Sequence, residues 1–258
     1  MSANARSPPV SHCEGCQDEH VTDYALLARF YDEFNGDPES RSRQVLDSIA
    51  RYLPATTSVL ELGCGTGAIL AGLGSGLELT GVDLSPEMLA YAKRRCPHAT
   101  LHQADMTSFS MRERFDVVVC IFDTVNHVTH FDGWLRMFER VREHLREGGL
   151  FIFDLTTLGR LAQLRDGAPW VQDFDEGTLI MDVDFDGEAL AQWDVRVFER
   201  HDDGRFELHH ERIVELGVSL ERVRAALVSW FDQLEECDES GGPPTDESER
   251  AYFVYRRR

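Results

Sequence analysis

The sequence has no long hydrophobic run: no apolar stretch approaches the ~20 residues that a membrane-spanning helix requires. The first ten residues are polar and contain prolines, without the apolar segment of a secretory signal. We therefore expect a cytoplasmic protein with no membrane partner. A chain of 258 residues is long enough for one sizeable α/β domain.

Positive charge is also scarce. Lys93 is the only lysine, and 46 acidic residues outnumber 26 basic ones, for a formal net charge of −20. The only run of basic residues is 256–258, at the end of the chain. Because the phosphates of a nucleic acid have to be neutralised by Lys and Arg, this composition argues against a nucleic-acid partner.

The six cysteines are few, and we expect them to be reduced. Cys64, Cys96 and Cys120 lie in or beside predicted core elements, where cysteine behaves as a small hydrophobe. Four potential zinc ligands lie close together near the start of the chain: His12, Cys13, Cys16 and His20. So compact a set usually supplies only half of a zinc site. We therefore predict no metal site, and a flexible tail over residues 1–21.

The feature around which the rest of the chain is organised is the segment 59–67. A short apolar run leads into Gly63, Gly65 and Gly67, and a helix start follows at Ala68. Alternate glycines let the backbone turn sharply and approach a ligand closely. The same spacing fits a dinucleotide-binding fingerprint or a glycine turn without a ligand, so the choice depends on residues further along the chain.

Acidic residues follow the predicted strands downstream of this loop. Asp83 ends a strand 20 residues past Gly63, Asp105 follows the third strand, and Asp154 closes the fifth. Strands that alternate with helices at this spacing predict a Rossmann-like, doubly wound, mostly parallel seven-stranded α/β sheet. Ligands on such sheets bind outside the carboxyl ends of the strands. The acids and the segment 122–127 therefore converge on one edge.

Two segments flank this sheet in the prediction of one domain over residues 22–258. Residues 22–54 form a helical cap, with one helix from Thr22 to Phe34 and a second up to Pro54. Residues 168–217 form an inserted antiparallel β-meander of three strands. The meander is either a lid over a substrate pocket or a structural cover, which includes the surface of a homodimer.

The chain resembles the class I S-adenosylmethionine-dependent methyltransferases in four places: 61–67, Asp83, 105–106 and 115–118. The similarity extends over roughly residues 22–157. Within the family, the segments 27–32 and 122–127 are similar to small-molecule enzymes, the deoxyaminosugar N-methyltransferases of bacterial antibiotic pathways. This resemblance implies methyl transfer to a nitrogen or oxygen of a small molecule, in natural-product biosynthesis.

The resemblance also implies a role for individual residues. S-adenosyl-L-methionine is the cofactor and S-adenosyl-L-homocysteine its product. Asp83 holds the ribose hydroxyls, Asp105 the adenine amino group, and Glu61 the glycine loop or the cofactor amine. An arginine between the first two helices, Arg41 or Arg43, meets the cofactor carboxylate. The complete set of predicted cofactor-binding residues is Tyr24, Arg43, Glu61, Gly63, Gly65, Asp83, Leu84, Met88, Asp105, Met106, Ile121 and Phe122.

For the transfer itself, we expect catalytic roles for His127 and Tyr31. An unperturbed histidine pKa of about 6.5 suits proton removal near neutral pH. His127 is either this base or a group that orients a loop, and Asp123 is an alternative contact for a cationic amine.

Two other functions stay open. A methyltransferase for RNA or protein would usually carry an Asn/Asp-Pro-Pro-aromatic run after the fourth strand, and residues 123–126 contain no proline. A catalytically silent partner subunit that binds the same cofactor would share all the cofactor motifs.

Overall fold

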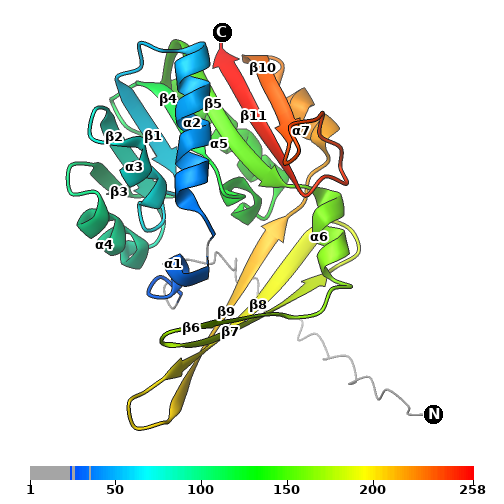
Figure 1. Cartoon of the computed structure of the whole chain (residues 1–258). Coiled ribbons are helices and arrows are strands. Elements are labelled where there is room, and N and C mark those ends of the chain that lie inside the picture. The colour runs from blue at the N-terminus through cyan, green and yellow to red at the C-terminus, as the bar shows by residue number, and fades with distance from the viewer. Residues whose placement is uncertain (1–23, 25–26, 35) are drawn as a thin grey trace.

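The computed structural model of the chain describes residues 24, 27–34 and 36–258 (Figure 1). The predicted tail over residues 1–21, with its four potential zinc ligands, lies outside the described residues. Among the helices of the described part, none is both long enough and apolar enough to cross a membrane.

A seven-stranded sheet forms the centre of the molecule, in the order β10-β11-β5-β4-β1-β2-β3. Strands β1 to β5 pair in parallel, and β11 and β10 add an antiparallel edge next to β5. The strands are β1 Ser58–Leu62, β2 Glu78–Asp83, β3 Thr100–Gln103, β4 Phe115–Cys120, β5 Leu145–Thr156, β10 Phe231–Asp238 and β11 Arg250–Arg257. The predicted mostly parallel sheet of seven strands is confirmed.

Helices cover both faces of this sheet. They are α1 Tyr31–Phe34, α2 Pro38–Tyr52, α3 Ala68–Leu73, α4 Pro86–Arg95, the 3-10 helix η1 Thr124–His127, α5 Phe131–His144, α6 Leu158–Leu164 and α7 Leu220–Leu227. Strand β1 is buried along its whole length, as expected for a strand between two helical layers. Leu60 and Leu62 belong to the core shared with α5 and α7, whereas Val59 belongs to the core shared with α2 and α3.

A second, antiparallel sheet lies beneath the edge where the parallel strands end (Figure 1). Its order is β6-β7-β8-β9, with β6 Trp170–Phe174, β7 Gly177–Phe185, β8 Leu190–Arg200 and β9 Phe206–Leu216. The inner face packs against Leu27 and Phe30. The meander is therefore present, but the prediction of three strands was wrong. Strand β6 was missed because apolar and polar residues do not alternate along it: Trp170 and Val171 are adjacent, and both are exposed.

One helix prediction was also wrong. The apolar spacing after Thr22 predicted a helix up to Phe34, but Tyr24 has φ 57°, which is left-handed, and among the described residues of this segment regular helix covers Tyr31–Phe34 alone. Helix α5 ends at His144, and β5 begins directly after it at Leu145. Ser85 Oγ caps helix α4 by accepting a hydrogen bond of 3.2 Å from the Met88 N–H.

Candidate functional site

The glycine loop between β1 and α3 has the backbone that its sequence requires. Gly63, Gly65 and Gly67 have φ angles of 63°, 52° and 76°, all in the left-handed region. A Cβ atom on Gly63 would lie 2.2 Å from Cγ2 of Thr124. The loop thus needs glycine at this position for its conformation and for the close approach of the segment after β4.

Asp83, at the end of β2, is tied to this loop. Its Oδ2 accepts a hydrogen bond of 2.7 Å from the Gly65 N–H, and its Oδ1 accepts one of 2.9 Å from the Ser85 N–H. Burial raises the pKa of Asp83, and the backbone N–H donors partly offset that rise. Because each carboxylate oxygen has a second lone pair, the side chain can still accept hydrogen bonds from a ligand.

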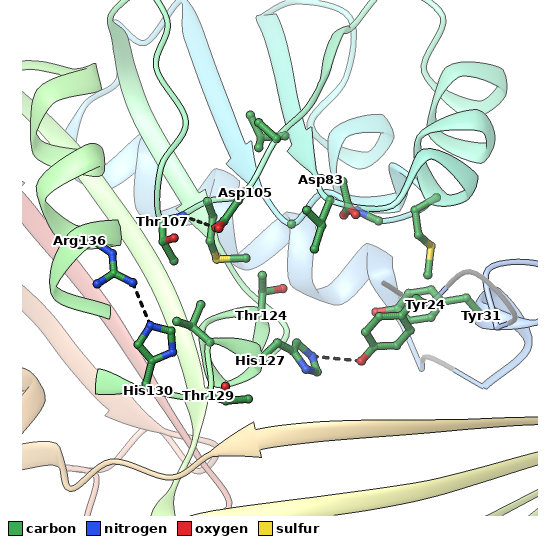
Figure 2. Close-up of a pocket in the computed structure, with 18 residues that line it drawn as sticks. Tyr24, Tyr31, Asp83, Asp105, Thr107, Thr124, His127, Thr129, His130 and Arg136 are labelled. Atoms are coloured by element: carbon green, nitrogen blue, oxygen red, sulfur yellow. Dashed lines mark hydrogen bonds between the residues drawn. The ribbon is translucent and has the colours of Figure 1, made fainter. Parts of the chain in front are cut away.

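The loop borders a cavity of about 300 Å³ at the carboxyl edge of the sheet (Figure 2). At one end, the Oδ1 atom of Asp105 accepts a hydrogen bond of 2.7 Å from the Thr107 N–H. At the opposite side, the aromatic ring of Tyr24 faces His127. Ten of the predicted site residues line this one cavity: Tyr24, Tyr31, Gly63, Gly65, Asp83, Leu84, Met88, Asp105, Met106 and His127.

A second cavity, of about 420 Å³, lies on the other side of the glycine loop. Glu61, Ile121 and Phe122 line it, and it shares Gly63 and Gly65 with the first cavity. The two cavities therefore meet at the loop. All predicted site residues except Arg43 border one of them.

Two charged side chains of the second cavity have buried atoms that lack a partner within the described part of the chain. They are Oε2 of Glu61, which is 3% exposed, and Nη1 of Arg41. Burial, reinforced by the charge of Asp83, raises the pKa of Glu61 well above its usual value. The Arg41 guanidinium stacks on the ring of Phe122, with its carbon 3.5 Å from the ring centroid.

The structure does not bring Arg43 to the site. In α2, Arg41 and Val45 are four residues apart and share the inner face, whereas Arg43 is exposed on the other side of the helix and lines neither cavity. Of the two arginines considered from the sequence, only Arg41 lies at the site.

The segment after β4 has a strained backbone that an ion-pair network holds in place. Phe122 and Asp123 have φ angles of 69° and 50°, which are uncommon for residues other than glycine. The Asp123 N–H donates a hydrogen bond of 2.7 Å to Asp154 Oδ1. Arg250 of β11 bridges both acids, at 2.7 Å from Asp123 Oδ2 and 2.9 Å from Asp154 Oδ1. Burial opposes ionisation of Asp123, but Arg250 and His127 outweigh it and lower its pKa.

Tyr24 and His127 form a hydrogen-bonded pair in the wall of the first cavity. The distance between Tyr24 Oη and His127 Nε2 is 3.1 Å, and the rings meet edge to face. Tyr31 packs edge to face on Tyr24, with ring centroids 5.6 Å apart. Burial lowers the pKa of His127, and Asp123 only partly offsets this, so the imidazole is neutral near pH 7. Figure 2 shows the three rings together.

Three residues at the site were missed from the sequence or given no role. Arg250 lies on the last strand, and no motif precedes it. Glu215 is a lone acid at the apolar end of β9, and it is 5% exposed. Thr124 fills the space beside Gly63. A buried acid within an apolar strand end is the one signal that could have drawn attention to Glu215.

Comparison with known proteins gives concordant results. Residues 59–149 match the family model of a methyltransferase domain. The dTDP-3-amino-3,6-dideoxy-alpha-D-glucopyranose N,N-dimethyltransferase of Streptomyces fradiae is 33% identical over 133 residues, 50% of this chain and 52% of its own length. The dTDP-3-amino-3,4,6-trideoxy-alpha-D-glucopyranose N,N-dimethyltransferase of Streptomyces venezuelae is 30% identical over 53% of this chain and 56% of its own. The chain thus spans about half the length of these two relatives.

A solved structure extends the similarity of fold over nearly the whole chain. The crystal structure of an S-adenosylmethionine-dependent methyltransferase from Clostridium acetobutylicum ATCC 824 superimposes with a TM-score of 0.80. It covers 91% of this chain and 98% of its own, with 24% sequence identity.

Proposed function

We propose that this chain, which is an S-adenosylmethionine-dependent methyltransferase, methylates the amino nitrogen of a small, sugar-like acceptor. The observation that carries the proposal is the Tyr24–His127 pair, because it faces the same cavity as the residues expected to hold the cofactor. The two Streptomyces relatives, both named as N,N-dimethyltransferases of nucleotide-linked amino sugars, support an amine acceptor.

The residues of the two cavities fit the cofactor. The glycine loop leaves room for a ligand against its backbone, and Asp83 retains lone pairs for the ribose hydroxyls. The two unpartnered buried atoms, Glu61 Oε2 and Arg41 Nη1, have opposite charges and lie in the second cavity. They match the ammonium and carboxylate of an amino acid. Asp105 and Met106 line the first cavity, where we place the adenine.

The bound cofactor supplies a methyl group that its sulfonium charge activates for displacement. The protein then has to align the acceptor nitrogen with this carbon and exclude water. We assign the alignment to Tyr24, Tyr31 and His127, since all three line the cavity beside the glycine loop. A neutral His127 ring can accept a proton, which suits an acceptor that loses one in the reaction.

The test is methyl transfer from labelled cofactor to a matched panel. The panel contains dTDP-3-amino-3,6-dideoxy-glucose, the corresponding sugar with a 3-hydroxyl group, and total tRNA. We expect label in the amino sugar alone. Label in the hydroxyl sugar or in tRNA, with none in the amine, would contradict the proposal.

A variant of the acceptor wall separates catalysis from cofactor binding. We expect His127→Ala to lower turnover of the amino sugar while calorimetry shows cofactor affinity close to that of the wild type. Wild-type turnover in this variant would mean that His127 has only a structural role. A part in natural-product biosynthesis stays a prediction.

A further inference from the structure

A series of polar groups leads from the first cavity into the interior between the two sheets. Tyr24 and His127 line the cavity, and Glu215 of β9 lies behind them with only 5% exposure. A ring nitrogen of His127, one oxygen of Asp123 and one oxygen of Glu215 lie within 4.8 Å of one another. These groups are thus close enough for a proton to pass between them after a small rotation or through one water.

The inner atoms of this series are unsatisfied. His127 Nδ1 and Glu215 Oε2 are both buried, and neither has a hydrogen-bond partner within residues 24, 27–34 and 36–258. Burying a polar atom without a partner costs about 1–3 kcal/mol. Because the outer ring nitrogen, Nε2, already bonds Tyr24, the unsatisfied Nδ1 is the nitrogen of the ring that is left for a second partner.

Asp123 and Glu215 differ in their electrostatic partners. Asp123 Oδ2 accepts hydrogen bonds of 2.7 Å from Arg250 and 3.0 Å from Thr156, so its charge is compensated. Glu215 has no ion pair in the described part of the structure. It is therefore the carboxyl group of this cluster that has spare capacity for a proton.

We infer that Glu215 is a positioning residue for the methyl transfer, which orients His127 and takes up, through its ring, the proton that the acceptor amine releases. This inference rests on the proposed N-methylation. It assigns Glu215 the inner end of a path whose outer members are Tyr24 and His127.

The nitrogen lone pair of the acceptor forms the new N–C bond while the C–S bond breaks and leaves its electron pair on sulfur. The methylated ammonium donates a proton to Tyr24 Oη, whose own proton moves to His127 Nε2. The proton on His127 Nδ1 then moves to the ionised Glu215. The sulfonium charge and the carboxylate charge disappear together, and solvent later takes the proton from Glu215.

The surroundings of Glu215 set its proton affinity. Burial raises its pKa well above the usual value, and Asp123 raises it further, whereas Arg250 and the Trp193 indole lower it. An ordinary carboxylate is too weak a base to take a proton from an ammonium near neutral pH, so the upward shift favours this role. Since the path needs ionised Glu215, turnover should rise as the pH rises through the pKa of this group.

Asp123, His127 and Glu215 are close enough together to hold a divalent metal ion. The charges around them do not fit such an ion. Asp123, Asp154 and Glu215 carry three negative charges, and Arg250 and Arg41 carry two positive charges that act on these acids. One negative charge is left over. A single proton neutralises it, while a divalent ion would leave an uncompensated positive charge in a buried site beside Arg250.

The test compares Glu215→Gln with Glu211→Gln, which changes an acid on the same face of β9 four residues away. With the amino sugar as acceptor between pH 6 and pH 9, we expect Glu215→Gln to lower kcat by about 10²-fold and to lose the rising acid limb. Glu211→Gln should keep the wild-type kcat and the rise of turnover with pH. Cofactor affinity should be unchanged in these variants. Glu215→Asp should restore part of kcat. A wild-type pH profile and kcat in Glu215→Gln would overturn the inference.

A second measurement needs no acceptor. Nitrogen NMR of the His127 ring should show a titration shared with Glu215 in the wild type, which disappears in Glu215→Gln but not in Glu211→Gln. An unchanged His127 titration, or stoichiometric binding of Mn²⁺ or Zn²⁺ that Glu215→Gln abolishes, would refute the proton path. A wild-type protein that binds the cofactor but methylates no amine would refute the proposed function instead, and the NMR result would still decide the role of Glu215.

Discussion

The N–H of Gly65 donates a hydrogen bond of 2.7 Å to Asp83 Oδ2 and so joins the glycine loop to the tip of the neighbouring strand. One carboxylate thereby fixes the loop and presents its remaining lone pairs to the cavity. Each carboxylate oxygen can accept two hydrogen bonds, so Asp83 can hold the loop and a ligand at the same time.

Asp83→Ala should weaken cofactor binding by about 2–3 kcal/mol, since it removes two charge-assisted hydrogen bonds. This corresponds to roughly a 30- to 150-fold rise in Kd. Titration calorimetry with S-adenosyl-L-methionine measures the change. Asp203→Ala, in the exposed turn before β9, is the control and should bind as the wild type does. Unchanged affinity in Asp83→Ala would disprove the ribose assignment.

Gly63→Ala should destabilise the fold through two separable effects. The new Cβ would lie 2.2 Å from Thr124 Cγ2, and the φ of 63° costs a residue with a side chain about 1–2 kcal/mol. Thr124→Ser deletes the clashing methyl group. The double variant should therefore recover the steric part of the loss in urea unfolding and keep the backbone part. Equal stability of the single and the double variant would show that the clash relaxes at no cost.

Local features of the sequence predicted most of the residues that the structure brings together around the two cavities. The glycine spacing, the acids Asp83 and Asp105, and His127 follow predicted strands, and the parallel topology brings strand ends to one edge. The network behind them could not be predicted in this way. Arg250 lies 127 residues from Asp123, and only the antiparallel pairing of β11 with β5 brings them together.

The N-terminal residues show a different limit. Apolar spacing predicted a helix through Tyr24, yet tertiary contacts outweighed that local preference. Tyr24 adopts φ 57° and bonds His127, 103 residues away. The choice between Arg41 and Arg43 likewise depended on the rotation of α2, which its apolar residues fix only once the sheet is in place.

Asp116→Asn should change how stability depends on pH. Burial opposes ionisation of Asp116, but hydrogen bonds from the Thr57 N–H and from Arg146 outweigh it and lower its pKa to about 2. Because the folded pKa lies below the unfolded value of 3.8, the ionised carboxylate stabilises the fold above pH 3.8, and this is lost as the pH falls towards 2.

The variant should be less stable than the wild type by roughly 1 kcal/mol at pH 7, a value discounted for partial solvent exposure. Urea unfolding at pH 7, 4 and 3 should show that the difference in the free energy of unfolding between wild type and variant becomes smaller as the pH falls. A difference that stays constant over this range would mean that the carboxylate of Asp116 contributes through packing alone.

Cofactor binding should release a proton from Glu61. Burial, reinforced by the charge of Asp83, raises the pKa of this carboxyl group, so in the free protein it holds its proton to a higher pH than an exposed glutamate does. If Oε2 receives the cofactor ammonium, the positive charge favours the ionised form, and the proton leaves on binding. Calorimetry in phosphate and in Tris, which differ in ionisation enthalpy, measures this release. Glu61→Gln should abolish it and weaken binding, whereas Glu39→Gln, at the exposed rim of the second cavity, should keep both. Equal proton release in Glu61→Gln and the wild type would assign the proton to another group and leave the cofactor ammonium without its proposed partner.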